Sequence, residues 1–293
     1  MKLMEDKRKA VIYALVACLI WGTVYVAIKV GLDHGLMPLT FAGVRFLAGG
    51  LMLLGVAYAK GGLKMTWRDV WVLTVFGFFQ TGVQNALFFT GVNLTNAGVS
   101  AIFINTSPFF VIMMAPLWFK DSRITPSRVA GVFIGFGGVA VSSFHPGQLS
   151  AGYELGVAAL VLSAVTWSGS TIAAKRIMAG RDPLTVTGMQ MTFGAVPLLL
   201  TGLAVERNGL AGSDTTGLLM LVYLIIFATS LPFYAWFRAL QFGEVGSVSV
   251  FTFTLPVLGV LSGWLILGEP LSVGLFFGMI MVAAGIVMVN RDA

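Results

Sequence analysis

The feature that most constrains this chain is a series of apolar stretches, each about as long as a bilayer core is thick. Hydrophobic residues make up 57% of the 293 residues and charged residues only 10%, a composition typical of integral membrane proteins. A helix crosses a hydrocarbon core of about 30 Å with about 20 apolar residues, and its backbone groups are then paired internally. We therefore predict an all-α integral membrane protein with ten transmembrane helices. The predicted spans are 10–30, 38–59, 70–92, 97–119, 126–144, 153–177, 183–205, 217–240, 246–267 and 271–289.

The basic residues predict the orientation of these spans. Lys and Arg concentrate in cytoplasmic connections, whereas acidic residues carry little topological weight. Fifteen of the eighteen basic residues fall on one side of the predicted bundle, and Arg207 alone falls on the other. The remaining two, Lys29 and Arg45, lie near the outer ends of the first and second spans. We therefore expect both termini to be cytoplasmic.

Matching motifs recur along the chain at separations of 145 to 148 residues. Such internal repeats are common in transporters. Each half would contain five spans, and an odd number places the second half in the opposite orientation. The sequence thus predicts two inverted five-helix repeats, at 10–145 and 153–290. The matching motifs are Trp21 with Lys29 and Trp167 with Lys175, Pro38-Leu39-Thr40 and Pro183-Leu184-Thr185, and Gly98 with Pro108 and Gly246 with Pro256.

Several kinds of chemistry lack the residues they need. All twelve acidic residues fall at span ends or in connections, which disfavours a buried proton relay. The sequence has no Walker loop, no His/Cys cluster and no convergent Ser, His and acidic set, so we expect neither an enzyme nor a metal site or cofactor. The net charge of +6 is explained by topology, and we expect no nucleic-acid partner.

The spans contain neutral polar groups and aromatic rings that would suit a pocket for a small solute. Gln80, Gln84 and Asn85 share one side of the third span, and Asn105 lies in the fourth. Hydrogen bonding between helices is the alternative role for these amides. Trp21 and Trp167 lie away from the interfaces where Trp accumulates, with core packing as the alternative. Further candidate aromatic residues, for which core or lipid contact is the alternative, are Tyr25, Phe79, Phe103 and Tyr234.

Pro108 and Pro256 interrupt the fourth and ninth spans at matching depths. Proline removes a helical hydrogen bond and favours a kink, so these residues are candidates for a gate, with a fixed bend as the alternative. Arg45 lies about 10 Å inside the second span. Its guanidinium is a candidate contact for a substrate carboxylate, or else it snorkels to the outer surface. Small-residue faces in the fifth and tenth spans favour close helix packing.

The chain resembles the EamA-type ten-helix members of the drug/metabolite transporter superfamily. The resemblance covers nearly the whole chain, although Asp121-Ser122 in the first half departs from Glu269-Pro270 in the second. It implies an inner-membrane exporter of amino acids or related metabolites, with a central cavity and alternating access. The motifs that carry it are 234–240, 255–258, 263–271 and 283–286 in the second half, and Ile20-Trp21-Gly22, Arg45-Phe46, Ser107-Pro108-Phe109 and Gly137-Gly138-Val139 in the first.

The function we expect is therefore secondary transport, with export of an aromatic or other apolar amino acid as the first candidate. A nucleotide-sugar or cationic drug carrier of the same superfamily is the alternative within this class. A membrane-embedded lipid enzyme and a non-transporting sensor subunit are alternatives of other classes. The partners we expect are a small-molecule substrate and the lipid bilayer, and the oligomeric state stays open.

Overall fold

The structure is a computed structural model that describes residues 2–61, 65–118, 125–143, 151–243, 245–268, 270–271 and 273–290. Every regular element in these residues is a helix. The connection 144–150 between the two predicted repeats, which includes His145, lies outside the described residues, as do Asp121 and Glu269.

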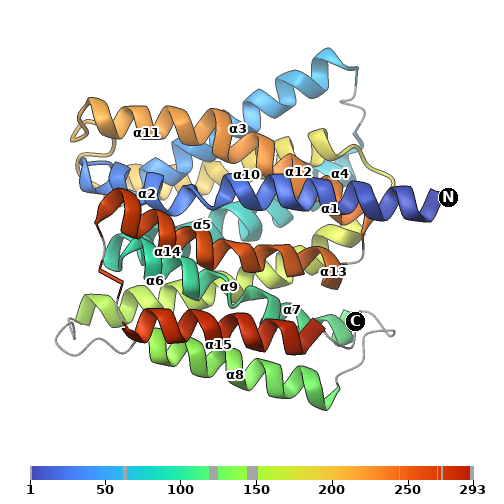
Figure 1. The fold of residues 1–293 in the computed structure, drawn as a ribbon. Coiled ribbons are helices and arrows are strands. Elements are labelled where there is room, and N and C mark those ends of the chain that lie inside the picture. The colour runs from blue at the N-terminus through green and yellow to red at the C-terminus, as the bar shows by residue number, and fades with distance from the viewer. Residues whose placement is uncertain are drawn as a thin grey trace.

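The helices run side by side along a common axis (Figure 1). Three short segments depart from α-helical geometry: the π-helices η1 (Phe78–Val83) and η2 (Ile226–Ser230) and the 3-10 helix η3 (Val250–Phe253). The α-helices are α1 (Lys2–Trp21), α2 (Val24–Asp33), α3 (Pro38–Ala59), α4 (Trp67–Gly77), α5 (Gln84–Leu94), α6 (Ala97–Ile104), α7 (Ser107–Trp118), α8 (Pro126–Ser143), α9 (Ala151–Ile177), α10 (Pro183–Val205), α11 (Thr215–Ile225), α12 (Leu231–Phe242), α13 (Val245–Ser249), α14 (Thr254–Leu267) and α15 (Val273–Asn290).

Seven helical stretches of the described residues are long and apolar enough to cross a membrane. Shorter apolar helices occupy the fifth, ninth and tenth predicted spans, at Val129–Gly138, Leu258–Leu267 and Val273–Gly285. The prediction of a multi-pass, all-helical membrane protein is confirmed for the described residues, whereas the count of ten spans stays a prediction. The start of α1 and the end of α15 lie at the same end of the bundle (Figure 1). The membrane face which that end occupies remains the prediction from charge.

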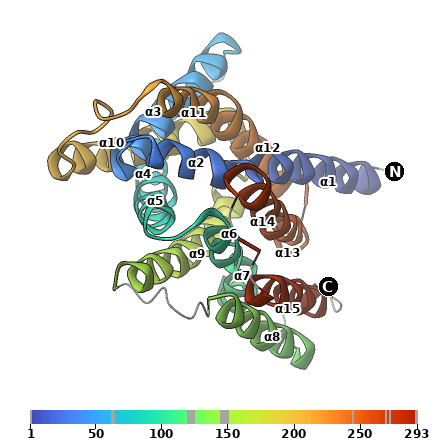
Figure 2. The ribbon, with the colours of Figure 1, turned by 60° about the vertical axis from the view of Figure 1, so that its left-hand side comes forward.

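Small residues allow two helix pairs to pack very closely. The helix α3 packs along α10, and α8 packs along α15 (Figure 2). A Cβ on Gly50 would lie 2.6 Å from Thr192 Oγ1, and one on Gly138 would lie 2.6 Å from the carbonyl oxygen of Gly278. These contacts confirm the close packing predicted for the fifth and tenth spans.

The first predicted span is interrupted, which the sequence analysis did not predict. A turn at Gly22 and Thr23 separates α1 from α2. The Thr23 hydroxyl donates to the carbonyl of Ile20 at 2.8 Å. This side-chain hydrogen bond gives the Ile20 carbonyl a partner other than the backbone N–H of a continuous helix. A Cβ on Gly22 would lie 2.7 Å from Leu258 Cδ1, so the absence of a side chain here lets α14 approach the turn.

The third and eighth predicted spans each contain a π-helix, η1 and η2, where we had predicted regular α-helix. The cause is clearest at η2, because Pro232 has no N–H to donate to the carbonyl of Ala228 four residues earlier. That carbonyl accepts instead from Arg45 Nη2 at 3.0 Å. Short π-helices inside α-helices occur frequently at functional sites.

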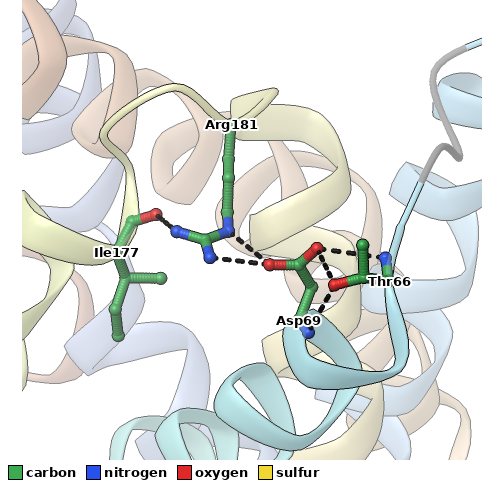
Figure 3. Close-up of polar contacts among 4 residues, drawn as sticks. All are labelled: Thr66, Asp69, Ile177 and Arg181. Carbon is green, nitrogen blue, oxygen red and sulfur yellow. Dashed lines mark hydrogen bonds and ion pairs between the residues drawn. The ribbon is translucent and has the colours of Figure 1, made fainter.

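An ion pair joins the start of α4 to the residues before α10 (Figure 3). Arg181 donates to Asp69 Oδ1 from Nε at 3.0 Å and from Nη2 at 2.6 Å. The other carboxylate oxygen of Asp69 accepts from the backbone and hydroxyl of Thr66 in a capping box at the start of α4. We call this end of the bundle, where α1 also starts, the Arg181 end.

A second pair occupies the opposite end. His34 Nδ1 lies 2.7 Å from Asp214 Oδ2, and Asp214 caps α11 by accepting from the backbone N–H of Gly217 at 3.0 Å. We call this end the His34 end. Asp214 follows Asp69 by 145 positions and Arg181 follows His34 by 147, which are close to the separations of the predicted repeats. The two pairs therefore occupy matching places in the two halves of the chain.

Candidate functional site: a central cavity

A cavity lies among helices from both halves of the chain. Its walls come from α1, α2, α3, α5, α6 and α7 in the first half and from α9, α12, η3 and α14 in the second. The lining is mostly apolar and carries a few polar groups, as in small-molecule sites generally. The lining residues are Trp21, Val24, Tyr25, Arg45, Phe46, Gln84, Asn85, Phe88, Ile104, Asn105, Ser107, Trp167, Phe233, Thr252 and Leu255.

One wall of the cavity is a cluster of aromatic rings. The rings of Trp21 and Trp167 meet edge to face with centroids 5.5 Å apart. Phe233 lies 5.2 Å from Trp21 and 5.8 Å from Trp167, and Trp236 packs behind both tryptophans. Edge-to-face contacts at these distances are favourable. The two tryptophans that occupy matching positions in the sequence thus meet in space and together form an apolar, π-rich surface.

Arg45 supplies a positive charge to the cavity. Its side chain is only 2% exposed and reaches into the second half of the chain, where Nε donates to Thr229 Oγ1 at 2.6 Å. The guanidinium also lies over Phe46 and Phe89, with Cζ 5.0 and 5.8 Å from their ring centroids. In the described part of the chain Arg45 makes no ion pair. An arginine stays charged in a protein, so this buried charge is held by dipoles and rings alone.

The remaining polar groups of the lining are neutral. Asn105 Nδ2 donates to Tyr25 Oη at 2.9 Å and to the carbonyl of Ala101 at 2.6 Å. Gln84 Nε2 donates to Ser163 Oγ at 3.0 Å, while Gln84 Oε1 is buried without a hydrogen-bond partner. Unpaired buried acceptors are costly and rare. The Gln84 amide oxygen is therefore an acceptor that the described protein groups leave unsatisfied.

The cavity brings together most of the polar and aromatic residues predicted from the sequence. Lys29, which the sequence left undecided, pairs with Asp33 at 3.4 Å and is not part of the lining. Arg45, the other undecided residue, does line the cavity. The predicted site residues found in the lining are Trp21, Tyr25, Arg45, Gln84, Asn85, Asn105 and Trp167.

Four of the predicted residues lie outside the lining of this cavity. Phe79 is 50% exposed and packs against Phe78 on the outside of the bundle. Gln80 and Phe103 are buried outside the lining. Tyr234 is half-buried and follows Phe233, which faces the cavity. Successive helical residues are rotated by about 100° around the helix axis, so the side chain of Tyr234 does not share the direction of Phe233.

The two prolines predicted as gates follow breaks in their helices. Pro108 is the second residue of α7, after the turn at Asn105 and Thr106 that ends α6. Pro256 is the third residue of α14, after the 3-10 helix η3, and its side chain lies outside the described residues. The predicted interruptions of the fourth and ninth spans are present. A gating role for them stays a prediction.

Three aromatic residues that the predicted set omitted also line the cavity: Phe46, Phe88 and Phe233. Signals in the sequence point to two of them. Phe88 lies one helical turn after Gln84, and Phe233 lies 148 positions after Asn85, the separation that relates Pro108 to Pro256. Among the described residues no cluster of three or more His, Cys, Asp or Glu exists that could hold a metal ion.

Comparison with known proteins decides the family. The model of the EamA-like transporter family matches residues 8–144 and again residues 154–291. The chain belongs to the EamA-like transporter family. Its apolar helices and its cavity of mainly apolar and neutral polar groups agree with a family that moves small molecules across membranes.

Relatives of this EamA-like transporter carry related names. It is 29% identical to the uncharacterized transporter YvbV of Bacillus subtilis, over 100% of this chain and 95% of the relative. It is 28% identical to a probable amino-acid metabolite efflux pump of Escherichia coli, over 95% and 94% of the two chains. One crystal structure covers 97% of this chain and 98% of its own with a TM-score of 0.75 at 20% identity, which shows the same fold.

Proposed function

We propose that this EamA-like protein is a secondary transporter of the plasma membrane that exports an aromatic or other apolar amino acid, or a closely related metabolite, by alternating access. The observation that carries the proposal is the joint presence of a buried guanidinium and an aromatic wall in one cavity. Arginine binds carboxylates in planar, two-point geometry. The indole rings of Trp21 and Trp167 offer a matching surface for an apolar side chain.

The relatives support the same class of substrate. A probable amino-acid metabolite efflux pump is similar to this chain over nearly its full length. A cationic drug is a less suitable substrate, because Arg45 would repel a second positive charge in the same cavity. A nucleotide sugar is also a less suitable substrate, because its several anionic groups would meet a single cationic residue in the described lining.

The membrane topology belongs to the same proposal. Ten spans in two inverted repeats, 10–145 and 153–290, would place both termini in the cytoplasm and the Arg181 end at the cytoplasmic face. The excess of Lys and Arg on that side supports this arrangement. Rocking of the two halves about the cavity would then expose it to each face in turn, with the helix breaks before Pro108 and Pro256 as the gates.

The proposal is tested by counterflow in liposomes with a panel of labelled amino acids. Trp167→Ala and Gln84→Ala remove a wall and an amide of the cavity, so we expect each to lower the rate at least about tenfold, the effect of 1.4 kcal/mol. Phe79→Ala is the matched control, because Phe79 is close to the lining residue Gln84 in the sequence but its side chain faces outward. Equal rates in all three variants would contradict the proposed site.

A further inference from the structure

The charge inside the cavity is unbalanced. Of the described residues that line it, only Arg45 is charged at neutral pH, and the partners of its guanidinium are a hydroxyl, a carbonyl and two rings. The repeat-matched position carries a neutral residue: Gln190 follows Arg45 by 145 positions, the separation between Pro38 and Pro183. A buried charge without a counterion is costly, and a carboxylate entering the cavity would supply that counterion.

Among its described lining residues the cavity offers no acidic partner for an ammonium group. The acceptors there are neutral, such as the unpartnered Gln84 Oε1. An ammonium held there would exchange its hydration for neutral acceptors and ring faces, and it would share the cavity with the Arg45 charge. The amino group of a zwitterion is therefore repelled by Arg45, whereas the carboxylate of an otherwise uncharged aromatic molecule meets an opposite charge there.

From this we infer that the preferred substrates are aromatic or apolar organic anions, carboxylates without a charged amino group, and that each crosses the membrane as a net negative charge. The inference rests on the proposed transport function, and among the substrates proposed there it favours related carboxylates over the amino acids themselves. It also bears on the driving force. No acidic residue lies in the middle of a span, so the chain lacks the buried carboxylate that usually couples transport to protons.

An anion needs no such coupling to leave a cell. With the cytoplasm negative, the membrane potential itself drives a negative charge outward. At 100 mV a single charge reaches a concentration ratio of about 50-fold, which corresponds to 2.3 kcal/mol. Export of an organic anion through a cavity with one fixed positive charge is therefore driven by the membrane potential, without a coupling ion.

Three matched probes test the inference: 3-phenylpropanoate, phenylalanine and 2-phenylethylamine, which share one ring and differ in charge. Each is loaded into proteoliposomes at about pH 8, where the carboxyl group is ionised, and the potential is set in both directions with a potassium gradient and valinomycin. We expect 3-phenylpropanoate to leave at least about tenfold faster than the amine. Its rate should rise when its own compartment is negative and fall when the potential is reversed. Protein-free liposomes measure the background leak.

Variants of Arg45 identify the source of the effect. Arg45→Gln gives the first half the residue of the second and should reduce anion efflux to the background, whereas Arg45→Lys keeps the charge and should retain the response to potential. The response of the unmodified protein to the membrane potential does not depend on whether a variant folds. This measurement tests the inference by itself. Phenylalanine transport that exceeds 3-phenylpropanoate transport and ignores the potential would overturn the inference but leave the transporter standing. Failure of all three probes would count against the proposed function itself.

Discussion

Gly22 illustrates at the scale of single residues how a missing side chain shapes the cavity. It follows Trp21 in the turn between α1 and α2, and Leu258 of α14 fills the space where a Cβ would stand. The turn in this way brings Trp21 and Tyr25 to the cavity from two separate helices. A position with such contacts tolerates no larger residue without movement of its neighbours.

We predict that Gly22→Ala destabilises the protein, because the new Cβ would lie 2.7 Å from Leu258 Cδ1 and 2.8 Å from its Cβ. Overpacking of this kind costs about 1–3 kcal/mol. Thermal unfolding in detergent measures the effect. Gly55→Ala is the control, since its Cβ would meet nothing within 4 Å and alanine favours a helix over glycine by about 1 kcal/mol. Equal midpoints for the two variants would show that the turn is not tightly packed.

The sequence predicted cavity residues best where two independent patterns agreed. Trp21 and Trp167 recur at matching positions, and the rings do meet. Gln80 and Gln84 were placed on one face because they lie four residues apart, but the π-helix η1 ends between them and alters the rotation. Only Gln84 consequently reaches the cavity. The prediction assumed a constant 3.6 residues per turn, so it could not take the change of rotation in η1 into account.

At the scale of elements, each of the two π-helices carries a polar contact between the halves of the chain. Thr229 in η2 accepts from Arg45 of α3, and Thr81 in η1 donates to Gln190 Oε1 of α10 at 2.7 Å. These are matching positions, since Thr229 follows Thr81 by 148 residues. The irregular turns thus position the helices that line the cavity against the opposite half.

Pro232→Ala tests the origin of η2. Alanine restores the N–H that an α-helix would pair with the carbonyl of Ala228, and that donor then competes with Arg45 Nη2. We expect transport to fall several-fold while the amount of folded protein stays the same, as measured by liposome uptake and size-exclusion chromatography. Pro116→Ala, inside α7, is the control. Full activity of Pro232→Ala would mean that Arg45 is held without this carbonyl.

The sequence predicted the elements well where hydropathy alone decides them. Long apolar stretches form helices because backbone groups in lipid have no other partner. The proline-marked breaks of the fourth and ninth spans were also predicted, since proline leaves a local trace. The break at Gly22 and the π-helix η1 depend on contacts with distant helices such as α14 and α10, which no local pattern reports.

At the scale of the whole molecule, the two ends of the bundle carry matching polar pairs of different chemistry. Arg181 and Asp69 form a two-point pair at one end, whereas His34 and Asp214 form a single contact at the other. The Gly217 backbone and then the His34 ring lower the pKa of the Asp214 carboxyl below its ordinary value of 3.8.

A lowered pKa in the folded state predicts the sign of the pH effect at Asp214. The ionised carboxylate adds stability above pH 3.8, and this contribution is lost as the pH falls toward the lowered pKa of the folded protein. We expect the unmodified protein to unfold at a higher temperature than Asp214→Asn near neutral pH, with the difference shrinking in acid. Thermal unfolding of both proteins over this range gives the measurement. A difference independent of pH would show that the charge is irrelevant.

The proposed orientation predicts where reporter labels become accessible. Single cysteines placed beside Arg207 and beside Lys60 should react with a membrane-impermeant reagent from opposite faces, with Lys60 on the cytoplasmic side. The native Cys18 is buried and should contribute little background. Labelling in intact cells and in inverted vesicles makes the comparison. Reaction of both positions from the same face would overturn the inverted arrangement of the halves.

Arg45 and Gln190 occupy matching positions in the two halves, but only Arg45 is charged. This difference has a kinetic consequence. A carrier assembled from two equivalent halves would present the same affinity to a solute arriving from either face, because each access state would be the image of the other. Here the charge that we propose to bind the solute belongs to one half only. The half-saturating concentration measured from the cytoplasmic face should accordingly differ from that measured outside, although the equilibrium across the membrane is the same.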